Sequence, residues 1–269
     1  MADPASSGRT QAFQFPWSGT DDEVPANLAV GSLRDSMLLW LKTDRGIHVE
    51  TLLTSIGAVA GFAAQTAVFA RVAERDVPLP AGADKGISAQ ALSTHLLDSG
   101  LFVSASTKSG ETFYFGDLIN GYLVPQVTGT YPLWGFVAAA AIAAGVKPDE
   151  LPDCSPMFRR VSETIGSAQF GVLQVAQEHQ PQIGMRQALD RFWPRTKFIL
   201  TRTDGPGPAN GRDVPLAYWP LVTALVARQF VLMSKDALDP RIGVAMLMES
   251  AIAMSKVDPK TVPRALSVE

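Results

Sequence analysis

The sequence is poor in charge. Asp, Glu, Lys and Arg make up 18% of its 269 residues, whereas roughly a quarter is usual for a soluble domain. Apolar residues reach 46%. A chain with so few charged side chains to cover its surface buries a large part of itself, either inside its own fold or against other copies of the chain.

Cysteine is almost absent as well. Cys154 is the only one, so no disulfide can form within the chain, which fits the reducing cytoplasm. The first residues also lack the basic start and apolar core of a secretory signal. The net charge of −3 and the pI near 5.7 argue against a general nucleic-acid-binding surface. We therefore expect a cytoplasmic protein without a nucleic-acid partner.

Recognisable catalytic and cofactor motifs are missing. The glycine-rich loop 204–214 has no Lys-Ser/Thr for a phosphate loop, and its prolines stand where backbone N–H donors are needed. His48-Val49-Glu50 matches half of the zinc deaminase signature, but the second thiolate that the metal requires is absent. The sequence thus predicts no cofactor and no metal, and leaves open whether the protein is an enzyme.

The most informative feature that is present is the run 51–70, which carries no charged side chain. As a helix it would be about 30 Å long, enough to cross a membrane or a large protein core. On a helical wheel, bulky and small residues gather on opposite sides. The bulky side holds Leu52, Ile56, Val59, Phe62 and Phe69, and the small side holds Gly57, Ala60, Gly61, Ala64 and Ala67. The small side would let a neighbouring backbone approach closely.

Polar residues within the run decide between membrane and core. Gln65 and several Thr and Ser side chains would be costly against lipid, and the flanks lack an aromatic belt or a basic cluster. We therefore predict a buried central helix over about 47–74 and no membrane partner.

The remaining pattern predicts a mainly α fold, a multihelical bundle around this central helix. Residues 1–26 are expected to form a partly irregular tail that docks through Phe13, Phe15 and Trp17, and residues 27–269 a single multihelical domain. Two β-rich runs around a polar turn predict one small β-hairpin at about 101–115. Proline and glycine positions predict helices over 156–179, 185–193 and 240–256, and 197–203 is interpreted as a third strand.

Residues that follow the hairpin are candidates for a ligand pocket. Tyr114, Asp117 and Asn120 combine an aromatic ring, a carboxylate and an amide near a strand-to-helix junction, and Asp117 and Asn120 are three apart on a short helix. The alternative is that Asp117 caps the helix and Asn120 begins a turn. His48 and Glu50 are further pocket candidates, although residues two apart on a helix diverge. Glu50 alternatively serves the helix N-terminus.

Two other segments suggest partners. The stretch 191–212 is the most basic of the chain, which favours either a small anionic ligand, an acidic partner or a solvated face balanced by nearby aspartates. The stretch 118–146 carries no charge. It is the expected contributor to a homo-oligomer interface, with Trp134 and Phe136 as anchors.

The segments 46–50, 52–53 and 56–65 resemble a family of uncharacterised, mainly helical bacterial proteins, and 110–120 fits the same pattern. The resemblance implies a helical fold and a bacterial cytosolic setting, and no activity or site. Two function classes follow from the sequence. The first is a non-enzymatic helical protein that acts through self-association or partner binding. The second is a small-molecule-binding protein or enzyme with a pocket between the hairpin and the central helix.

Overall fold

The computed structural model describes residues 14–73, 103–108, 110–125, 131–201 and 213–263. These residues are mainly helical, as predicted. The α-helices are α1 (Glu23–Leu41), α2 (Val49–Ala73), α4 (Asp117–Leu123), α5 (Leu133–Ala143), α6 (Ser155–Thr164), α7 (Met185–Thr201), α8 (Trp219–Ser234) and α9 (Pro240–Met254). Short 3-10 turns are η1 (Pro148–Glu150), η2 (Gln177–His179) and η3 (Leu216–Tyr218). The strands are β1 (Lys42–Thr43), β2 (Gly46–Ile47), β3 (Val103–Ser106) and β4 (Thr112–Phe115).

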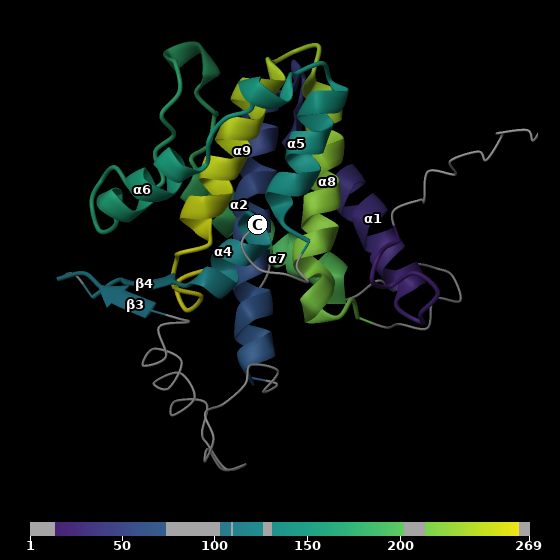
Figure 1. Cartoon of the computed structure of the whole chain (residues 1–269), viewed down its shortest axis with the longest axis horizontal. Helices are drawn as coiled ribbons and strands as arrows, with labels where there is room; N and C mark the ends of the chain where they lie inside the picture. Colours follow the sequence, from purple (N-terminus) through teal and green to yellow (C-terminus); the bar gives the residue numbers. More distant parts are fainter. Residues whose placement is uncertain (1–13, 74–102, 109, 126–130, 202–212, 264–269) are drawn as a thin grey trace, which may run out of the picture.

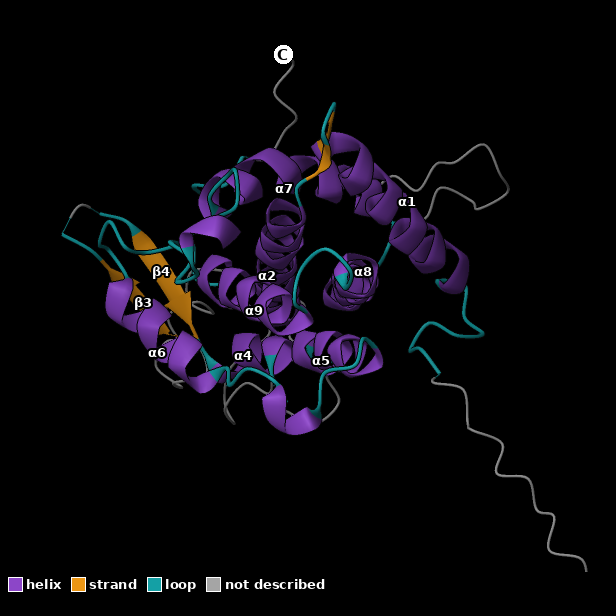
Figure 2. Cartoon of the chain, turned by 90° about the horizontal axis from the view of Figure 1, so that it is seen from above, coloured by secondary structure: helices purple, strands orange, loops and turns teal. Residues whose placement is uncertain are grey.

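Helix α2 is the centre of the bundle, as the sequence predicts. Viewed along its axis it is surrounded by α1, α7, α8 and α9, with α5 packed outside α8 and α9 (Figure 2). Every residue from 51 to 65 is buried. Some of its polar groups find partners elsewhere: the Gln65 amide donates to the Val257 carbonyl at 2.9 Å, and the Ser250 hydroxyl donates to the Thr54 carbonyl at 2.8 Å. These bonds offset part of the cost of burying polar groups. The hydroxyls of Thr54 and Ser55 have no partner among the described residues.

The small face of α2 packs against α9. A Cβ atom on Gly57 would overlap the carbonyl of Leu247, and one on Gly61 would overlap the carbonyl of Ala251. The two backbones are therefore in direct contact, as expected from the glycine spacing. Figure 1 shows α9 lying along α2 in the middle of the molecule.

Two helical stretches in the described part of the chain are long and apolar enough to cross a membrane, Val49–Arg71 and Leu216–Ser234. Within the fold, 89% and 61% of their apolar windows are buried by other parts of the protein. This burial is consistent with a soluble protein, because neighbouring helices take the place that lipid would otherwise fill.

The N-terminal segment is more ordered than the predicted tail. Trp17 is fully buried, with its ring stacked on Phe15 at 5.3 Å between centroids and edge-on to Tyr218 at 5.4 Å. Helix α1 begins at Glu23, inside the segment predicted to be tail, and the Glu23 carboxylate accepts the Gly19 N–H at 2.7 Å. Phe13, the third predicted docking residue, lies outside the described residues.

Two predicted elements are wrong. The helix expected over 156–179 ends at Thr164, because Gly166 and Gly171 adopt φ values of 71° and 76°, which belong to the left-handed region and not to a helix. The strand expected over 197–203 is the last part of α7, as far as Thr201. Helix α7 passes through Pro194 instead of ending there, and the amphipathic pattern continues beyond it with Thr196 and Leu200 buried.

The predicted hairpin is present. Strands β3 and β4 pair antiparallel, with Val103 opposite Phe115 and Ser106 opposite Thr112. The hairpin contacts the chain just after α9, where the Tyr114 N–H donates to the Lys256 carbonyl at 2.8 Å and Phe113 forms a bridge with Val257. Strand β4 is thereby fixed beside the far end of α2.

Candidate functional site

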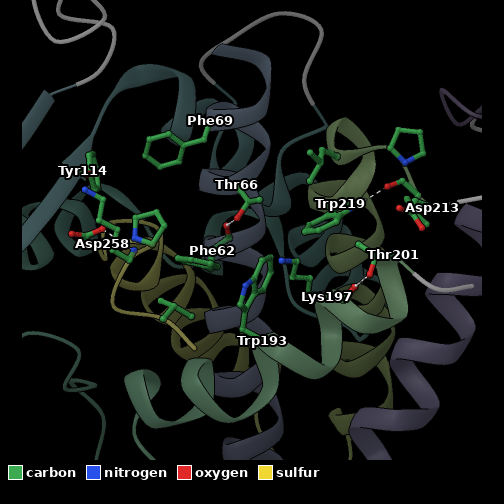
Figure 3. Close-up of a pocket in the computed structure, with 16 residues that line it drawn as sticks. Phe62, Thr66, Phe69, Tyr114, Trp193, Lys197, Thr201, Asp213, Trp219 and Asp258 are labelled. Carbon is green, nitrogen blue, oxygen red and sulfur yellow. Dashed lines mark hydrogen bonds between the residues drawn. The ribbon is translucent and has the colours of Figure 1, made fainter. Parts of the chain in front are cut away.

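A cavity of about 790 Å³ lies between α2, β4, α7, the start of α8 and the segment 258–262. It is in the range of small-molecule sites. Five aromatic residues from four of these elements line it: Phe62, Phe69, Tyr114, Trp193 and Trp219. Figure 3 shows the rings distributed around the space, with Phe69 and Tyr114 on one side and Trp219 on the other.

The aromatic walls hold one another in place. Phe62 meets Trp193 edge to face at 4.7 Å between ring centroids, and Phe69 meets Tyr114 in the same way at 5.3 Å. The ring centroids of Trp193 and Trp219 are 5.8 Å apart. The Trp219 indole N–H donates to the Val214 carbonyl at 2.8 Å. Edge-to-face pairs and a satisfied indole restrict the rings, so the cavity is largely formed before any ligand enters.

Polar groups at the cavity are few. The hydroxyl of Thr66 donates to the Phe62 carbonyl at 2.8 Å, and that of Thr201 donates to the Lys197 carbonyl at 2.9 Å. Their protons are therefore used within α2 and α7. The charged residues that line the cavity are Lys197, Asp213, Asp258 and Lys260. Two cations and two anions at an aromatic-lined space can orient a ligand that has an apolar body and a polar end.

The predicted site residues fall into three places. Tyr114 lines the cavity. Burial raises the pKa of its hydroxyl, and the neighbouring Asp258 carboxylate adds to the shift. Asp117 and Asn120 are on α4, where Asp117 is exposed and Asn120 faces Lys256. The pocket expected between the hairpin and the central helix thus contains one of the three residues predicted from the segment after the hairpin.

Asn120 belongs to a second cluster, around a buried lysine. The Lys256 ammonium donates to the Asn120 Oδ1 at 2.8 Å and lies 5.9 and 5.8 Å from the ring centroids of Phe115 and Phe158. Only 2% of Lys256 is exposed. Burial lowers the pKa of Lys256 to about 7, against a smaller opposing effect of the Asp117 carboxylate. Sequence reasoning missed this residue, although a single lysine between Ser255 and Val257 at the end of an apolar helix is a signal.

His48 and Glu50 lie at the other end of α2. The His48 Nδ1 is 3.5 Å from one Glu50 carboxylate oxygen, and the His179 Nδ1 is 3.2 Å from the other. The expectation that His48 and Glu50 diverge was wrong, because His48 precedes the first residue of α2 and is not bound by helical geometry. With a rise of 1.5 Å per residue, roughly 30 Å of helix separates Glu50 from Phe69. The two histidines and Glu50 therefore do not contribute to the aromatic cavity.

A metal site is not formed by these groups. Within the described ranges, no set of three or more His, Cys, Asp or Glu side chains is arranged to hold a metal ion. A second, smaller cleft of about 290 Å³ is lined by Trp134, Cys154 and Phe158, among others. Burial, with a contribution from Asp153, raises the pKa of the Cys154 thiol to about 12. The thiol stays protonated at neutral pH and is a poor nucleophile.

The basic stretch 191–212 is divided by the fold. Arg191 and Arg195 lie over the rings of Phe192 and Trp40, at 5.4 and 5.5 Å from the centroids, whereas Lys197 lines the cavity. Residues 202–212 are outside the described part of the chain. Sequence reasoning did not identify Phe62, Trp193 or Trp219 as cavity residues, because a ring that lines a cavity and a ring that fills a core give the same sequence pattern.

No protein-family model, no curated protein and no solved structure shows a significant match to this chain. The assignment of a function therefore rests on the geometry of the cavity.

Proposed function

We propose that this is a small-molecule-binding protein whose ligand occupies the cavity between the β3–β4 hairpin and α2. The observation that carries the proposal is the cavity itself, about 790 Å³ in volume and lined by five aromatic side chains. The cavity is open to solvent along part of its boundary, so the ring faces that line it are in contact with water. A ligand with a largely apolar body would remove these faces from water, which is favourable.

The walls come from segments distant in sequence. Phe69 of α2 and Tyr114 of β4 face the cavity from one side, and Trp193 of α7 and Trp219 of α8 from the other (Figure 3). A ligand in contact with all four would tie the hairpin, the central helix and the C-terminal half of the chain together. Binding to the folded state alone would therefore raise the melting temperature.

The test uses N-phenyl-1-naphthylamine, a neutral apolar dye whose fluorescence rises in apolar surroundings. We expect saturable binding to the wild-type chain. The variant T66W places an indole in the cavity from α2, and we expect it to weaken dye binding by roughly tenfold or more, equivalent to about 1.4 kcal/mol.

The matched control is L39W, which adds the same indole at a side chain of α1 that is 71% exposed. L39W should bind the dye like the wild type. Absence of saturable binding to the wild type, or equal binding to T66W with an unchanged melting temperature, would refute the cavity as a ligand site.

Self-association remains a second proposal, supported by the outer face of α5. Gly135, Ala139, Ile142 and Ala143 are exposed at helical spacing, and none is charged. The anchors proposed from the sequence, Trp134 and Phe136, are half-buried against the core. Light scattering on the wild type and on A139E tests this surface: we expect a larger species for the wild type, and a monomer at high concentration would exclude it. We also propose a bacterial cytoplasmic setting, because segments within 46–65 resemble uncharacterised bacterial proteins.

A further inference from the structure

We infer that the ligand of the aromatic cavity carries an anionic group, such as a carboxylate, sulfonate or phosphate, which is bound by Lys197. This inference rests on the proposed small-molecule function and specifies its ligand as a mainly apolar anion.

Lys197 is the central charge. Figure 3 shows its side chain entering the cavity next to Trp193, between the aromatic groups of the two sides. Within the part of the chain that the structure describes, its ammonium makes no hydrogen bond and no ion pair. Of the three arginines of the same helix, Arg191 and Arg195 lie over aromatic rings, and Arg186 pairs with Asp190. Among the described residues, Lys197 is thus the cation of α7 that lines the cavity and has no counter-ion.

The two carboxylates are at the ends of the cavity. Asp258 lies near Tyr114 at one end and Asp213 lies beyond Trp219 at the other (Figure 3). Asp258 also accepts the backbone N–H of Lys260 at 2.8 Å. Neither carboxylate forms an ion pair with Lys197 in the described structure. A cationic ligand group in the middle of the cavity would therefore meet Lys197 before either aspartate.

Lys197 is exposed in the chain without a ligand, and a bound ligand would make its surroundings less polar. Charge–charge attraction increases as water is displaced, and a ligand body against Trp193 and Phe62 would displace it. A lysine ammonium is a compact point charge with three donors, and it binds carboxylate, sulfonate and phosphate oxygens alike. Lys260 is a second cation at the cavity lining and can add to the attraction. The cavity would therefore recognise both the anionic group and the apolar body of the ligand.

The experiment compares two dyes that differ by one group. 8-Anilinonaphthalene-1-sulfonate is N-phenyl-1-naphthylamine with a sulfonate added. Both are titrated against the wild type and K197M, in which the side chain keeps a similar length and loses its charge. We expect K197M to weaken binding of the sulfonate dye by roughly five- to tenfold, as for the loss of one charge-assisted hydrogen bond. Binding of the neutral dye should change by less than about twofold, because the apolar walls remain.

The control is K235M, which removes an exposed lysine just after α8 that does not line the cavity. K235M should bind both dyes like the wild type. Equal weakening of both dyes in K197M would show that Lys197 contributes packing and not charge recognition, and an unchanged sulfonate affinity would also overturn the inference. Either result leaves the cavity as a binding site, provided that T66W blocks the neutral dye. If neither dye binds the wild type, the proposed function itself fails, and the anion preference with it.

Discussion

Gly61 of α2 lies directly against the carbonyl of Ala251 in α9, so closely that any side chain on Gly61 would occupy the same space as that oxygen. Gly57 stands in the same relation to Leu247, one turn earlier. The Ser250 hydroxyl bonds to the Thr54 carbonyl across the same interface at 2.8 Å. The two helices are therefore joined through their backbones, and their separation is set by the absence of two Cβ atoms.

Replacement of either glycine by alanine should force α2 and α9 apart. The overlapping atom belongs to the backbone and cannot rotate away, so we expect G61A and G57A each to lower the free energy of unfolding by about 2–3 kcal/mol, as in other overpacked cores. Urea unfolding followed by circular dichroism measures the change. The matched control is G31A on α1, where a Cβ would meet nothing within 4 Å. G31A should gain about 0.5–1 kcal/mol from helix propensity, and a similar loss in all three variants would contradict the interface.

The stability of the protein should depend on pH through Lys256. Its pKa is lowered by burial from 10.5 to about 7 in the folded state. Between these two values the unfolded chain binds more protons than the folded one, so the free energy of unfolding rises with pH. The contribution is at most about 1.4 kcal/mol per pH unit. We expect K256M to lose this dependence, and the wild type to gain about 1–2 kcal/mol over K256M between pH 7.0 and 8.5.

The upper limit of that pH range is set by Cys154. Its pKa is raised from 9.0 to about 12 by burial, so above pH 9 the unfolded chain releases a proton that the folded chain keeps, and the free energy of unfolding falls as pH rises. Urea midpoints at pH 7.0, 7.5, 8.0 and 8.5 isolate Lys256. Parallel curves for the wild type and K256M would show that the amine is hydrated in the folded state.

The ion pair between Arg160 and Glu249 should stabilise the fold because the arginine compensates the charge of a buried carboxylate. The Arg160 guanidinium donates to both Glu249 oxygens, at 2.9 and 2.7 Å, and the Glu249 side chain is 7% exposed. R160M leaves a buried carboxylate without its partner, and we expect a loss of about 3 kcal/mol in the free energy of unfolding. The double variant R160M/E249M removes both charges and should recover most of this loss. A double variant no more stable than R160M would show that packing, and not the charge, is lost.

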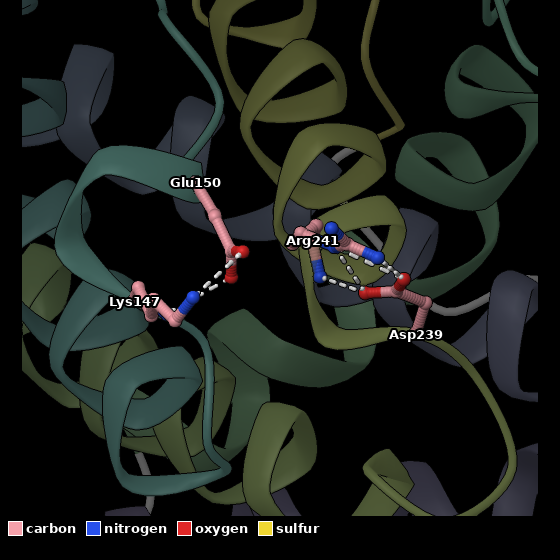
Figure 4. Close-up of polar contacts among 4 residues, drawn as sticks. All are labelled: Lys147, Glu150, Asp239 and Arg241. Carbon is pink, nitrogen blue, oxygen red and sulfur yellow. Dashed lines mark hydrogen bonds and ion pairs between the residues drawn. The ribbon is translucent and has the colours of Figure 1, made fainter.

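The stability of the start of α9 should depend more on its N-terminal cap than on the exposed ion pair. The Asp239 carboxylate accepts the Arg241 N–H at 2.9 Å, and the Arg241 guanidinium folds back onto the same carboxylate (Figure 4). We expect D239A to cost about 1 kcal/mol. D239N keeps the capping oxygen and should stay within a few tenths of the wild type. R241M removes only an exposed ion pair, similar in kind to Lys147–Glu150 in the same figure, and should leave the midpoint of thermal unfolding nearly unchanged.

The candidate site was predictable only in its location. Tyr114 was identified because it combines an aromatic ring with a strand-to-helix junction, and it does line the cavity between the hairpin and α2. Phe62 and Trp193 were not identified, because their spacing fits a filled core equally well. His48 and Glu50 were grouped with Tyr114 by residue type alone, and the length of α2 separates them. The contact of His179 with Glu50 joins residues far apart in sequence, and no local sequence pattern predicts it.

The sequence by itself determined the elements whose signals are local. The uncharged run of α2, its glycine face, the Asp239 cap and the hairpin turn each follow from side-chain periodicity or backbone preference over a few residues. Only the tertiary structure decided which helix meets the glycines, where α6 stops, and that five aromatic rings line an open cavity instead of filling a core. Those outcomes depend on the relative positions of surfaces from opposite ends of the chain. A cavity and a filled core differ by a few ångströms in the positions of their side chains. The periodicity of the sequence does not predict positions at that scale.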